Sequence, residues 1–165
     1  MQMYSNEGQN ISLRRLLPEA RFVGAGDVRV RSCSCDSRGV RPGDLFVALA
    51  GRVHDGHDFA AEAARRGARA ILAQRHLPAV DLPLCCVPDT RPAYARLCQA
   101  LAGNPSEHLC AVGITGTNGK TTTSCLVASV LSTAGYRVGL LGTLGGFDGL
   151  DFQDSTLTTP PPPEL

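Results

Sequence analysis

A glycine-rich segment with a lysine and several hydroxyl side chains spans residues 113 to 122 and reads Gly-Ile-Thr-Gly-Thr-Asn-Gly-Lys-Thr-Thr. Glycine lets backbone amides approach phosphate oxygens closely, and a helix that starts there attracts negative charge at its N-terminus. We expect Lys120 to reach the terminal phosphates of a nucleoside triphosphate and the Thr121 hydroxyl to coordinate the Mg²⁺ that bridges them. The segment therefore predicts an ATP site with Mg²⁺, in which Lys120 and Thr121 have catalytic roles. The expected nucleotide contacts are Gly116, Thr117, Asn118, Gly119, Lys120, Thr121 and Thr122.

The surroundings of this loop decide between a phosphate site and an incidental glycine-rich turn. The generic phosphate-loop pattern has glycine five residues before Gly119, where this chain has Ile114. The continuous apolar run 109–114 nevertheless predicts a buried parallel strand before the loop, and residues 120–134 predict a helix that Gly135 ends. Because a strand before the loop and a helix after it are what the motif requires, we favour the phosphate site.

A strand over 137–141 would complete a βαβ unit, which a glycine-rich loop at 142–146 follows. One such unit of about 60 residues buries too little to stand as a domain, so the second part of the chain is expected to be the truncated start of a P-loop parallel-sheet domain.

The first part of the chain shows its own alternation of strands and helices. The expected strands are 44–50, 68–73 and 83–87, and the expected helices are 59–67 and 89–102. Such alternation indicates an α/β sheet. Four turn formers at 103–106 mark a boundary, so we predict an N-terminal α/β domain over 1–105 and a second domain over 106–165.

Composition limits the partners and the compartment. The chain has 165 residues, 43% of them hydrophobic, and a formal charge of +1 without a long basic run, which disfavours nucleic acid as a partner. No stretch approaches the roughly 18 apolar residues of a membrane span, and no signal-peptide pattern opens the chain, so a cytoplasmic protein that does not bind membranes is expected. The seven cysteines lack a CxxC pair and are interpreted as reduced structural residues rather than metal ligands.

The chain resembles the Mur ligases, which add amino acids to UDP-N-acetylmuramic acid during peptidoglycan synthesis. The resemblance rests on the loop 115–122, which shares the family's departure at Ile114, and on two earlier blocks, Asp36-Ser37-Arg38 and 42–48, followed by Gly51 and Asp55-Gly56. It implies a UDP-binding function for 1–105 and ATP binding for 106–165.

Within the family, the tail is most similar to the branch that adds the third amino acid, meso-diaminopimelate or lysine, to UDP-N-acetylmuramoyl-L-alanyl-D-glutamate. Thr156-Leu157-Thr158-Thr159-Pro160 with Glu164-Leu165 resembles the substrate loop of that branch. Three alternatives remain: the D-Ala-D-Ala-adding branch, a non-catalytic UDP-sugar or nucleotide-binding fragment, and an unrelated P-loop NTPase.

The resemblance also implies substrate-binding residues. Cys35 and Ser37 are expected beside the uridine, with Ser37 as a hydrogen-bond donor, and Thr158 and Thr159 are expected to contact the muramoyl-dipeptide. The loop Arg52-Val53-His54 is expected to contact the uracil or the diphosphate. Alternatively, Arg52 and His54 are solvated loop side chains. The spacing of His54 and His57 with Asp58 also permits a metal site, which we do not favour.

The implied reaction is ATP-dependent amide formation through an acyl phosphate. Lys120 and the Mg²⁺ held by Thr121 would stabilise the transferring phosphoryl group, and Thr158 and Thr159 would position the acceptor. The family's carbamylated lysine and its domain that selects the amino acid are expected beyond Leu165, so this chain alone is not expected to be a competent ligase.

Overall fold

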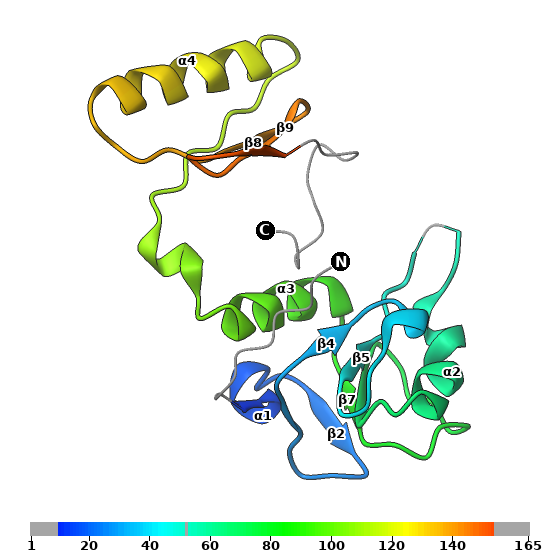
Figure 1. Ribbon diagram of the computed structural model, residues 1–165. Helices are drawn as coiled ribbons and strands as arrows, with labels where there is room; N and C mark the ends of the chain where they lie inside the picture. Colours follow the sequence, from blue (N-terminus) through cyan, green and yellow to red (C-terminus); the bar gives the residue numbers. More distant parts are fainter. Residues whose placement is uncertain (1–9, 52, 154–165) are drawn as a thin grey trace. The chain divides into compact units, whose positions relative to one another are not determined.

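The computed structural model of the chain describes residues 10–51 and 53–153. The chain divides into two compact units, residues 1–108 and 109–165 (Figure 1). The binding function expected of each part stays a prediction.

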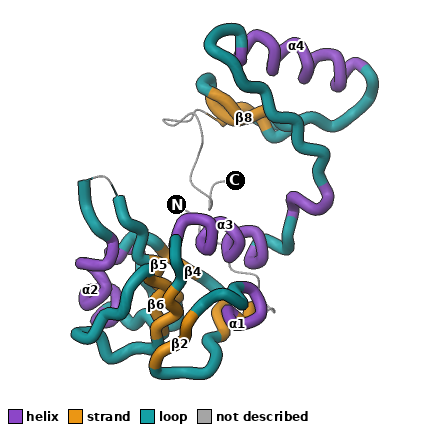
Figure 2. The backbone as a smooth tube through the Cα atoms, turned by 180° about the vertical axis from the view of Figure 1, so that it is seen from behind, coloured by secondary structure: helices purple, strands orange, loops and turns teal. Residues whose placement is uncertain are grey.

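A five-stranded sheet forms the centre of the first unit (Figure 2). Its strands lie in the order β2-β7-β6-β5-β4; β4 to β7 are parallel, and β2 pairs antiparallel with β7. The strands are β2 (Arg21–Val23), β4 (Cys33–Ser34), β5 (Leu45–Val47), β6 (Ala70–Ala73) and β7 (Leu84–Cys86), with a separate pair of β1 (Ile11–Ser12) and β3 (Arg29–Val30). The predicted α/β class is therefore confirmed.

Helices cover both faces of this sheet (Figure 1). They are α1 (Leu13–Leu16), α2 (Ala60–Arg65) and α3 (Thr90–Leu101), with 3₁₀ turns η1 (Ser37–Gly39), η2 (Gly56–Phe59) and η3 (Pro105–His108). The Asp89 side chain caps α3 by accepting the backbone N–H of Arg91, and Gly67 at φ +95° follows the end of α2, where a left-handed residue is common. Both helices lie where the sequence predicts them.

Side chains alternate along the buried strands, and this alternation builds two cores. Leu45 and Val47 of β5 pack on the side of α3, whereas Phe46 between them packs on the side of α2. All three are almost completely buried, as expected for a parallel strand covered on both faces. The carboxyl ends of β4 to β7 thus lie at one edge of a sheet that helices cover on both faces.

The second unit contains one helix and a small antiparallel sheet. Helix α4 (Lys120–Thr133) matches the prediction closely, and β8 (Leu140–Gly142), β9 (Gly145–Phe147) and β10 (Phe152–Gln153) lie in the order β10-β9-β8. None of the described residues of α4 is buried. This unit therefore has little core of its own among the described residues.

The strand predicted over 109–114 is wrong. The structure assigns no strand there, and Leu109 and Val112 are 70% and 64% exposed. A buried parallel strand needs ladder partners and cover on both faces, and within residues 109–153 the strands β8 to β10 pair only with one another. The predicted βαβ unit is consequently not formed in the described part. The predicted strand 137–141 is displaced to β8, and the expected loop 142–146 is instead the end of β8, the turn and the start of β9 in a hairpin.

Candidate substrate and nucleotide sites

The carboxyl edge of the first unit's sheet gathers polar residues from successive parallel strands. Ser37 follows β4, a loop that leads into η2 follows β5, Arg75 follows β6, and Arg91 lies in the first turn of α3 after β7. Ligands of open α/β sheets bind outside the carboxyl ends of the strands. Among the residues that the sequence singles out, Ser37, Val53 and His54 all follow strands that end at this edge.

Ser37 is buried and hydrogen-bonded to α2. Its hydroxyl donates to Glu62 Oε2 at 2.9 Å, and Arg66 Nε donates to the other carboxylate oxygen at 3.1 Å. The bond from Ser37, followed by the interaction with Arg66, lowers the pKa of Glu62. A hydroxyl has one proton to donate, so this arrangement leaves Ser37 only acceptor positions for a ligand. The predicted donor role is therefore not supported while Glu62 accepts that proton.

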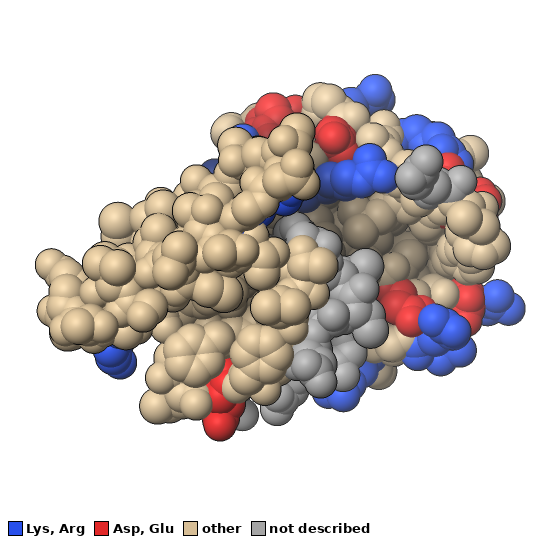
Figure 3. Space-filling view, turned by 90° about the horizontal axis from the view of Figure 1, so that it is seen from above, with Lys and Arg blue, Asp and Glu red and all other residues tan. Residues whose placement is uncertain are grey.

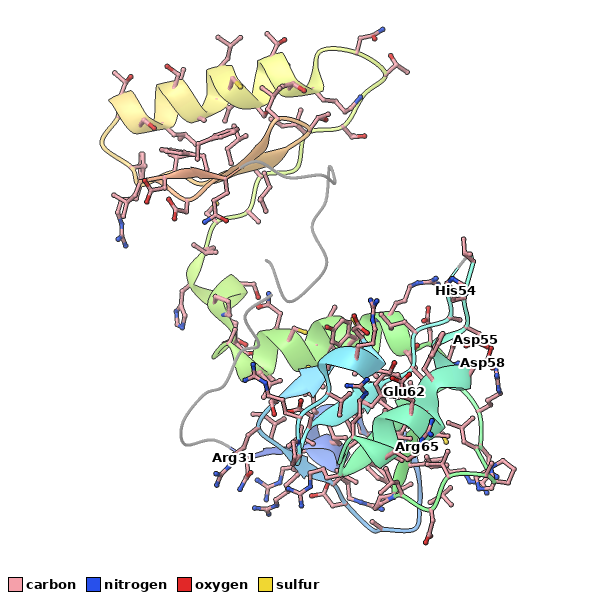
Figure 4. The ribbon with its side chains drawn as sticks, turned by 45° about the vertical axis from the view of Figure 1, so that its right-hand side comes forward. Arg31, His54, Asp55, Asp58, Glu62 and Arg65 are labelled. Atoms are coloured by element: carbon pink, nitrogen blue, oxygen red, sulfur yellow. The ribbon has the colours of Figure 1, made fainter. Side chains whose placement is uncertain are left out.

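The loop after β5 is narrow at its base. Ala50 and Asp55 form an antiparallel bridge, and the Gly51 N–H donates to the His54 carbonyl at 2.9 Å. A side chain on Gly51 would meet that carbonyl oxygen at 2.6 Å, which explains the glycine. Val53 is 85% exposed, and the exposed His54 packs its ring edge-on against Phe59. Both side chains are therefore exposed, and Figure 4 shows His54 on this loop. Arg52 lies outside the described residues.

His57 is a buried anchor of this loop. Its Nε2 accepts the backbone N–H of Gln74 at 2.9 Å, which requires the ring proton to be on Nδ1, 2.5 Å from Asp55 Oδ1. Asp55 also pairs with Arg75 at 2.9 Å. The His57 backbone N–H, the His57 ring and the Arg75 guanidinium hold the pKa of Asp55 well below its usual range. Asp55, Arg75 and Glu62 have no predicted site role. Asp55 and Arg75 are 20 residues apart and Ser37 and Glu62 are 25 apart, so no spacing rule connects either pair.

In the described part of the chain, His54, His57 and Asp58 do not come together as a metal site. Within residues 10–51 and 53–153, no three His, Cys, Asp or Glu side chains are grouped to hold a metal ion. His57 Nδ1 and Nε2 are both used, by Asp55 and Gln74. His57 therefore acts as a structural link between the loop and the end of β6.

Cys35 lies just past β4, beside the core of the first unit. Tyr94 of α3 donates its hydroxyl to Cys35 Sγ at 3.6 Å, and burial, followed by this bond, raises the pKa of Tyr94. Cys35 is half-buried. Its predicted place beside a uridine stays a prediction. All seven cysteines are free thiols.

The glycine-rich loop of the second unit leads directly into α4. Gly119 is the N-cap at φ +77°, a left-handed conformation that suits glycine, and it has no side chain to cap the helix. The first intrahelical bond runs from the Thr123 N–H to the Gly119 carbonyl at 2.8 Å. The preceding N–H groups of the first turn have no intrahelical acceptor and are suited to bind phosphate oxygens.

Lys120 is the only lysine of the chain, and its ammonium lies over the same loop. Its Nζ donates to the carbonyls of Gly116 and Thr117 at 2.7 and 3.3 Å. The cation and the N-terminus of α4 therefore meet at one loop, where both favour a polyanion. The side chain of Thr121 stands in the first turn of α4, half-buried, and its hydroxyl is a suitable oxygen ligand for Mg²⁺. The loop fits the triphosphate and metal that the sequence predicts.

Two further expected contacts, Thr158 and Thr159, lie outside the described residues. The charged side chains on the face shown in Figure 3 are interspersed in both signs rather than gathered in one patch. In the described ranges, no helix has the length and apolar character needed to cross a membrane.

The chain is an α/β protein with two units: the parallel strands of the first end at one sheet edge, and the second has a glycine-rich loop at the N-terminus of a helix. Residues 29–100 match the Mur ligase family, catalytic domain, and residues 114–165 match the Mur ligase middle domain. The chain belongs to the Mur ligase family.

Two similar curated proteins carry the name UDP-N-acetylmuramoyl-L-alanyl-D-glutamate--2,6-diaminopimelate ligase. The protein of this name from Geobacillus thermodenitrificans is 44% identical over 82% of the chain, and the one from Clostridium botulinum is 39% identical over 94%. The chain spans 27% and 33% of the lengths of these two relatives. It therefore covers about a third of such a protein.

Solved structures show the same fold. A structure of UDP-N-acetylmuramoyl-L-alanyl-D-glutamate--2,6-diaminopimelate ligase superposes with a TM-score of 0.66 over 94% of the chain and 32% of its own, at 24% identity. The UDP-N-acetylmuramoylalanyl-D-glutamyl-2,6-diaminopimelate--D-alanyl-D-alanyl ligase from Acinetobacter baumannii gives a TM-score of 0.52 over 87% of the chain and 30% of its own, at 25% identity.

Proposed function

We propose that this chain forms the UDP-substrate-binding and ATP-binding parts of a ligase that adds 2,6-diaminopimelate to UDP-N-acetylmuramoyl-L-alanyl-D-glutamate in peptidoglycan synthesis. The observation that carries the proposal is the 39–44% identity to relatives of that name over most of the chain. Because the chain spans about a third of those relatives, the activity is proposed for the whole ligase. The cytoplasmic location expected from the sequence is part of this proposal.

The first unit is proposed to bind the UDP part of the substrate at the carboxyl edge of its sheet. Ser37 accepts a hydrogen bond from the ligand while it donates to Glu62, and Val53 and His54 present an exposed contact surface on the following loop. An imide N–H such as that of uracil supplies the donor that this acceptor requires. Cys35 and Arg52 are assigned to this part of the substrate by family resemblance alone, and Thr158 and Thr159 are assigned to the muramoyl-dipeptide part on the same ground.

The second unit is proposed to bind the triphosphate of ATP through the loop 116–122. Backbone N–H groups at the start of α4 contact phosphate oxygens, and Lys120 moves its ammonium from the loop carbonyls to the phosphates. The Thr121 hydroxyl would hold Mg²⁺.

ATP and Mg²⁺ together supply an electrophilic phosphoryl group with its charge offset. A substrate carboxylate oxygen bonds to the γ-phosphorus as ADP leaves, and the amine of the diamino acid then displaces phosphate from the acyl carbon and loses a proton. Lys120 stabilises the charge on the transferring group.

Diaminopimelate is favoured over lysine as the added amino acid because the curated relatives reported above carry diaminopimelate in their names. The D-Ala-D-Ala-adding branch is supported more weakly, by a solved structure at 25% identity. These two ligases use different UDP substrates, and this difference allows them to be separated by binding.

Isothermal titration calorimetry with the 165-residue chain tests the proposal. We expect saturable binding of UDP-N-acetylmuramoyl-L-alanyl-D-glutamate, and tighter binding of it than of the corresponding UDP-muramoyl-tripeptide. Tighter binding of the tripeptide would support the D-Ala-D-Ala-adding branch. Binding of ATP without any UDP-muramoyl compound would contradict the proposal.

A further inference from the structure

The base of the loop 51–54 is held from two sides by arginines of neighbouring elements. The loop closes on the backbone bridge between Ala50 and Asp55. Arg91 contacts the first residue of this bridge and Arg75 contacts the second. The two arginines therefore act on one backbone feature from α3 and from the end of β6.

Arg91 holds the first side of the bridge. Its Nη2 donates to the Ala50 carbonyl, and the neighbouring Thr90 donates its hydroxyl to the Ala48 carbonyl at 3.1 Å. Thr90 is completely buried, and the Asp89 cap orients this first turn of α3. The position of the Ala50 carbonyl is thus tied to the start of a 12-residue helix.

Arg75 holds the second side. Its Nη1 lies 2.9 Å from Asp55 Oδ2, while the other oxygen of that carboxylate binds the ring and backbone N–H of buried His57. The Arg75 side chain is 54% exposed. An ion pair this exposed contributes little to global stability. Its contribution is instead local, because it fixes the residue at which the loop returns to the sheet.

We propose that Arg91 and Arg75 are positioning residues, which hold the Ala50–Asp55 bridge so that the backbone of Gly51 and the side chains of Val53 and His54 are ordered before a ligand binds. This inference rests on the proposed function of the first unit as the UDP-binding part. Preorganising a loop lowers the entropic cost of binding, so loss of either arginine weakens affinity without unfolding the sheet.

Substitution of Arg91 tests the first half of the inference. Arg91→Met removes the donor and keeps an extended side chain, and Arg91→Lys restores one donor for the Ala50 carbonyl. Arg96→Met is the matched control, since Arg96 is exposed on the same helix and its partner is Glu19 rather than the loop. The dissociation constant for UDP-N-acetylmuramoyl-L-alanyl-D-glutamate is measured by calorimetry, together with the thermal midpoint.

We expect Arg91→Met to weaken binding about tenfold, the magnitude of one lost charge-assisted hydrogen bond. Arg91→Lys should recover most of the affinity, and Arg96→Met should bind like the wild type. In the free Arg91→Met chain, backbone order parameters of Gly51, Val53 and His54 should fall from about 0.85 toward 0.6, with the thermal midpoint unchanged. Arg75→Met should have the same local effect. The double variant should lose less affinity than the two single losses added, because both residues hold one bridge.

The outcomes separate this inference from the proposed function. If the wild-type chain binds no UDP-muramoyl compound, the proposed function is wrong, but the order parameters still test whether the arginines hold the loop. If the wild type binds and Arg91→Met and Arg75→Met bind equally well with unchanged order parameters, the positioning role is overturned. A fall in affinity accompanied by an equal effect of Arg96→Met also overturns it.

Discussion

Ser37 of η1 and Glu62 of α2 are joined by a 2.9 Å hydrogen bond across 25 positions of sequence, with Ser37 as the donor. Glu62 is held from its other side by Arg66, which also donates to the carbonyl of Arg38 at 3.2 Å. The orientation of Ser37 is therefore determined by α2, and its lone pairs remain to accept from a ligand.

Replacing Ser37 tests this acceptor role. Ser37→Ala should weaken binding of UDP-N-acetylmuramoyl-L-alanyl-D-glutamate about five- to tenfold, the loss of a single hydrogen bond, as measured by calorimetry. Ser106→Ala, in the exposed turn η3, is the control and should leave affinity unchanged. Equal affinity of Ser37→Ala and the wild type would remove Ser37 from the site.

Asp55 predicts a pH dependence of stability. The pKa of its carboxyl group is lowered in the folded state, so the unfolded state binds more protons in the acid range. The stabilisation of the folded state is therefore complete above about pH 5 and is lost as pH falls below about 4. Urea unfolding of the first unit, followed between pH 3 and 7, should show a smaller loss of stability on acidification for Asp55→Asn than for the wild type. Asp58→Asn is the control, because its contact with Arg75 is longer, at 3.9 Å. Parallel pH curves for Asp55→Asn and the wild type would contradict the account in which the hydrogen bonds from His57, together with Arg75, favour the ionised form of Asp55.

Gly56 is required by the close approach of two backbone segments. A Cβ at this position would lie 2.7 Å from both the N and the O of Leu49, to which Gly56 is hydrogen-bonded at 2.8 Å. Gly56→Ala should therefore lower the free energy of unfolding by about 1–3 kcal/mol. Gly26→Ala is the matched control, since nothing lies within 4 Å of a Cβ there. Equal stability of the two variants in urea would show that the loop relaxes freely.

Lys120 allows a direct measurement at the loop, because the chain has no other lysine. Mg²⁺-ATP should slow the modification of its ε-amine by an amine-reactive reagent, with the N-terminal amine as an internal control of unchanged rate. Lys120→Met should bind ATP at least about tenfold more weakly, since a charge-assisted hydrogen bond to phosphate is lost. Modification at the same rate with and without Mg²⁺-ATP would count against a triphosphate at this loop.

The sequence predicts those elements whose own residues determine their structure. Helix α3 has its cap at Asp89 and an apolar repeat, and β5 and β6 are continuous apolar runs, so pattern and structure agree. The strands β1 to β3 have two or three residues each, too few for any periodicity, and they were not predicted. The run 109–114 has strand composition without a ladder partner in the described part, because composition alone does not supply a neighbouring strand.

The candidate sites also contain one part that the sequence predicts and another that it does not. The loop before α4 is continuous in sequence, so its motif could be found directly. The bond between Ser37 and Glu62 and the two arginines at Ala50 and Asp55 join positions 20 to 41 residues apart, and no spacing rule connects them. These contacts depend on the order of strands in the sheet, which the fold alone reveals.

The central claim, that one chain binds a UDP-muramoyl substrate in its first unit and ATP in its second, is tested most directly by ¹H–¹⁵N NMR titration of the 165-residue chain. UDP-N-acetylmuramoyl-L-alanyl-D-glutamate should shift the amide signals of Ser37, Val53 and His54, and Mg²⁺-ATP should separately shift those of Gly119, Lys120 and Thr121. No shift of the first group with the UDP compound, or none of the second group with Mg²⁺-ATP, would contradict the claim.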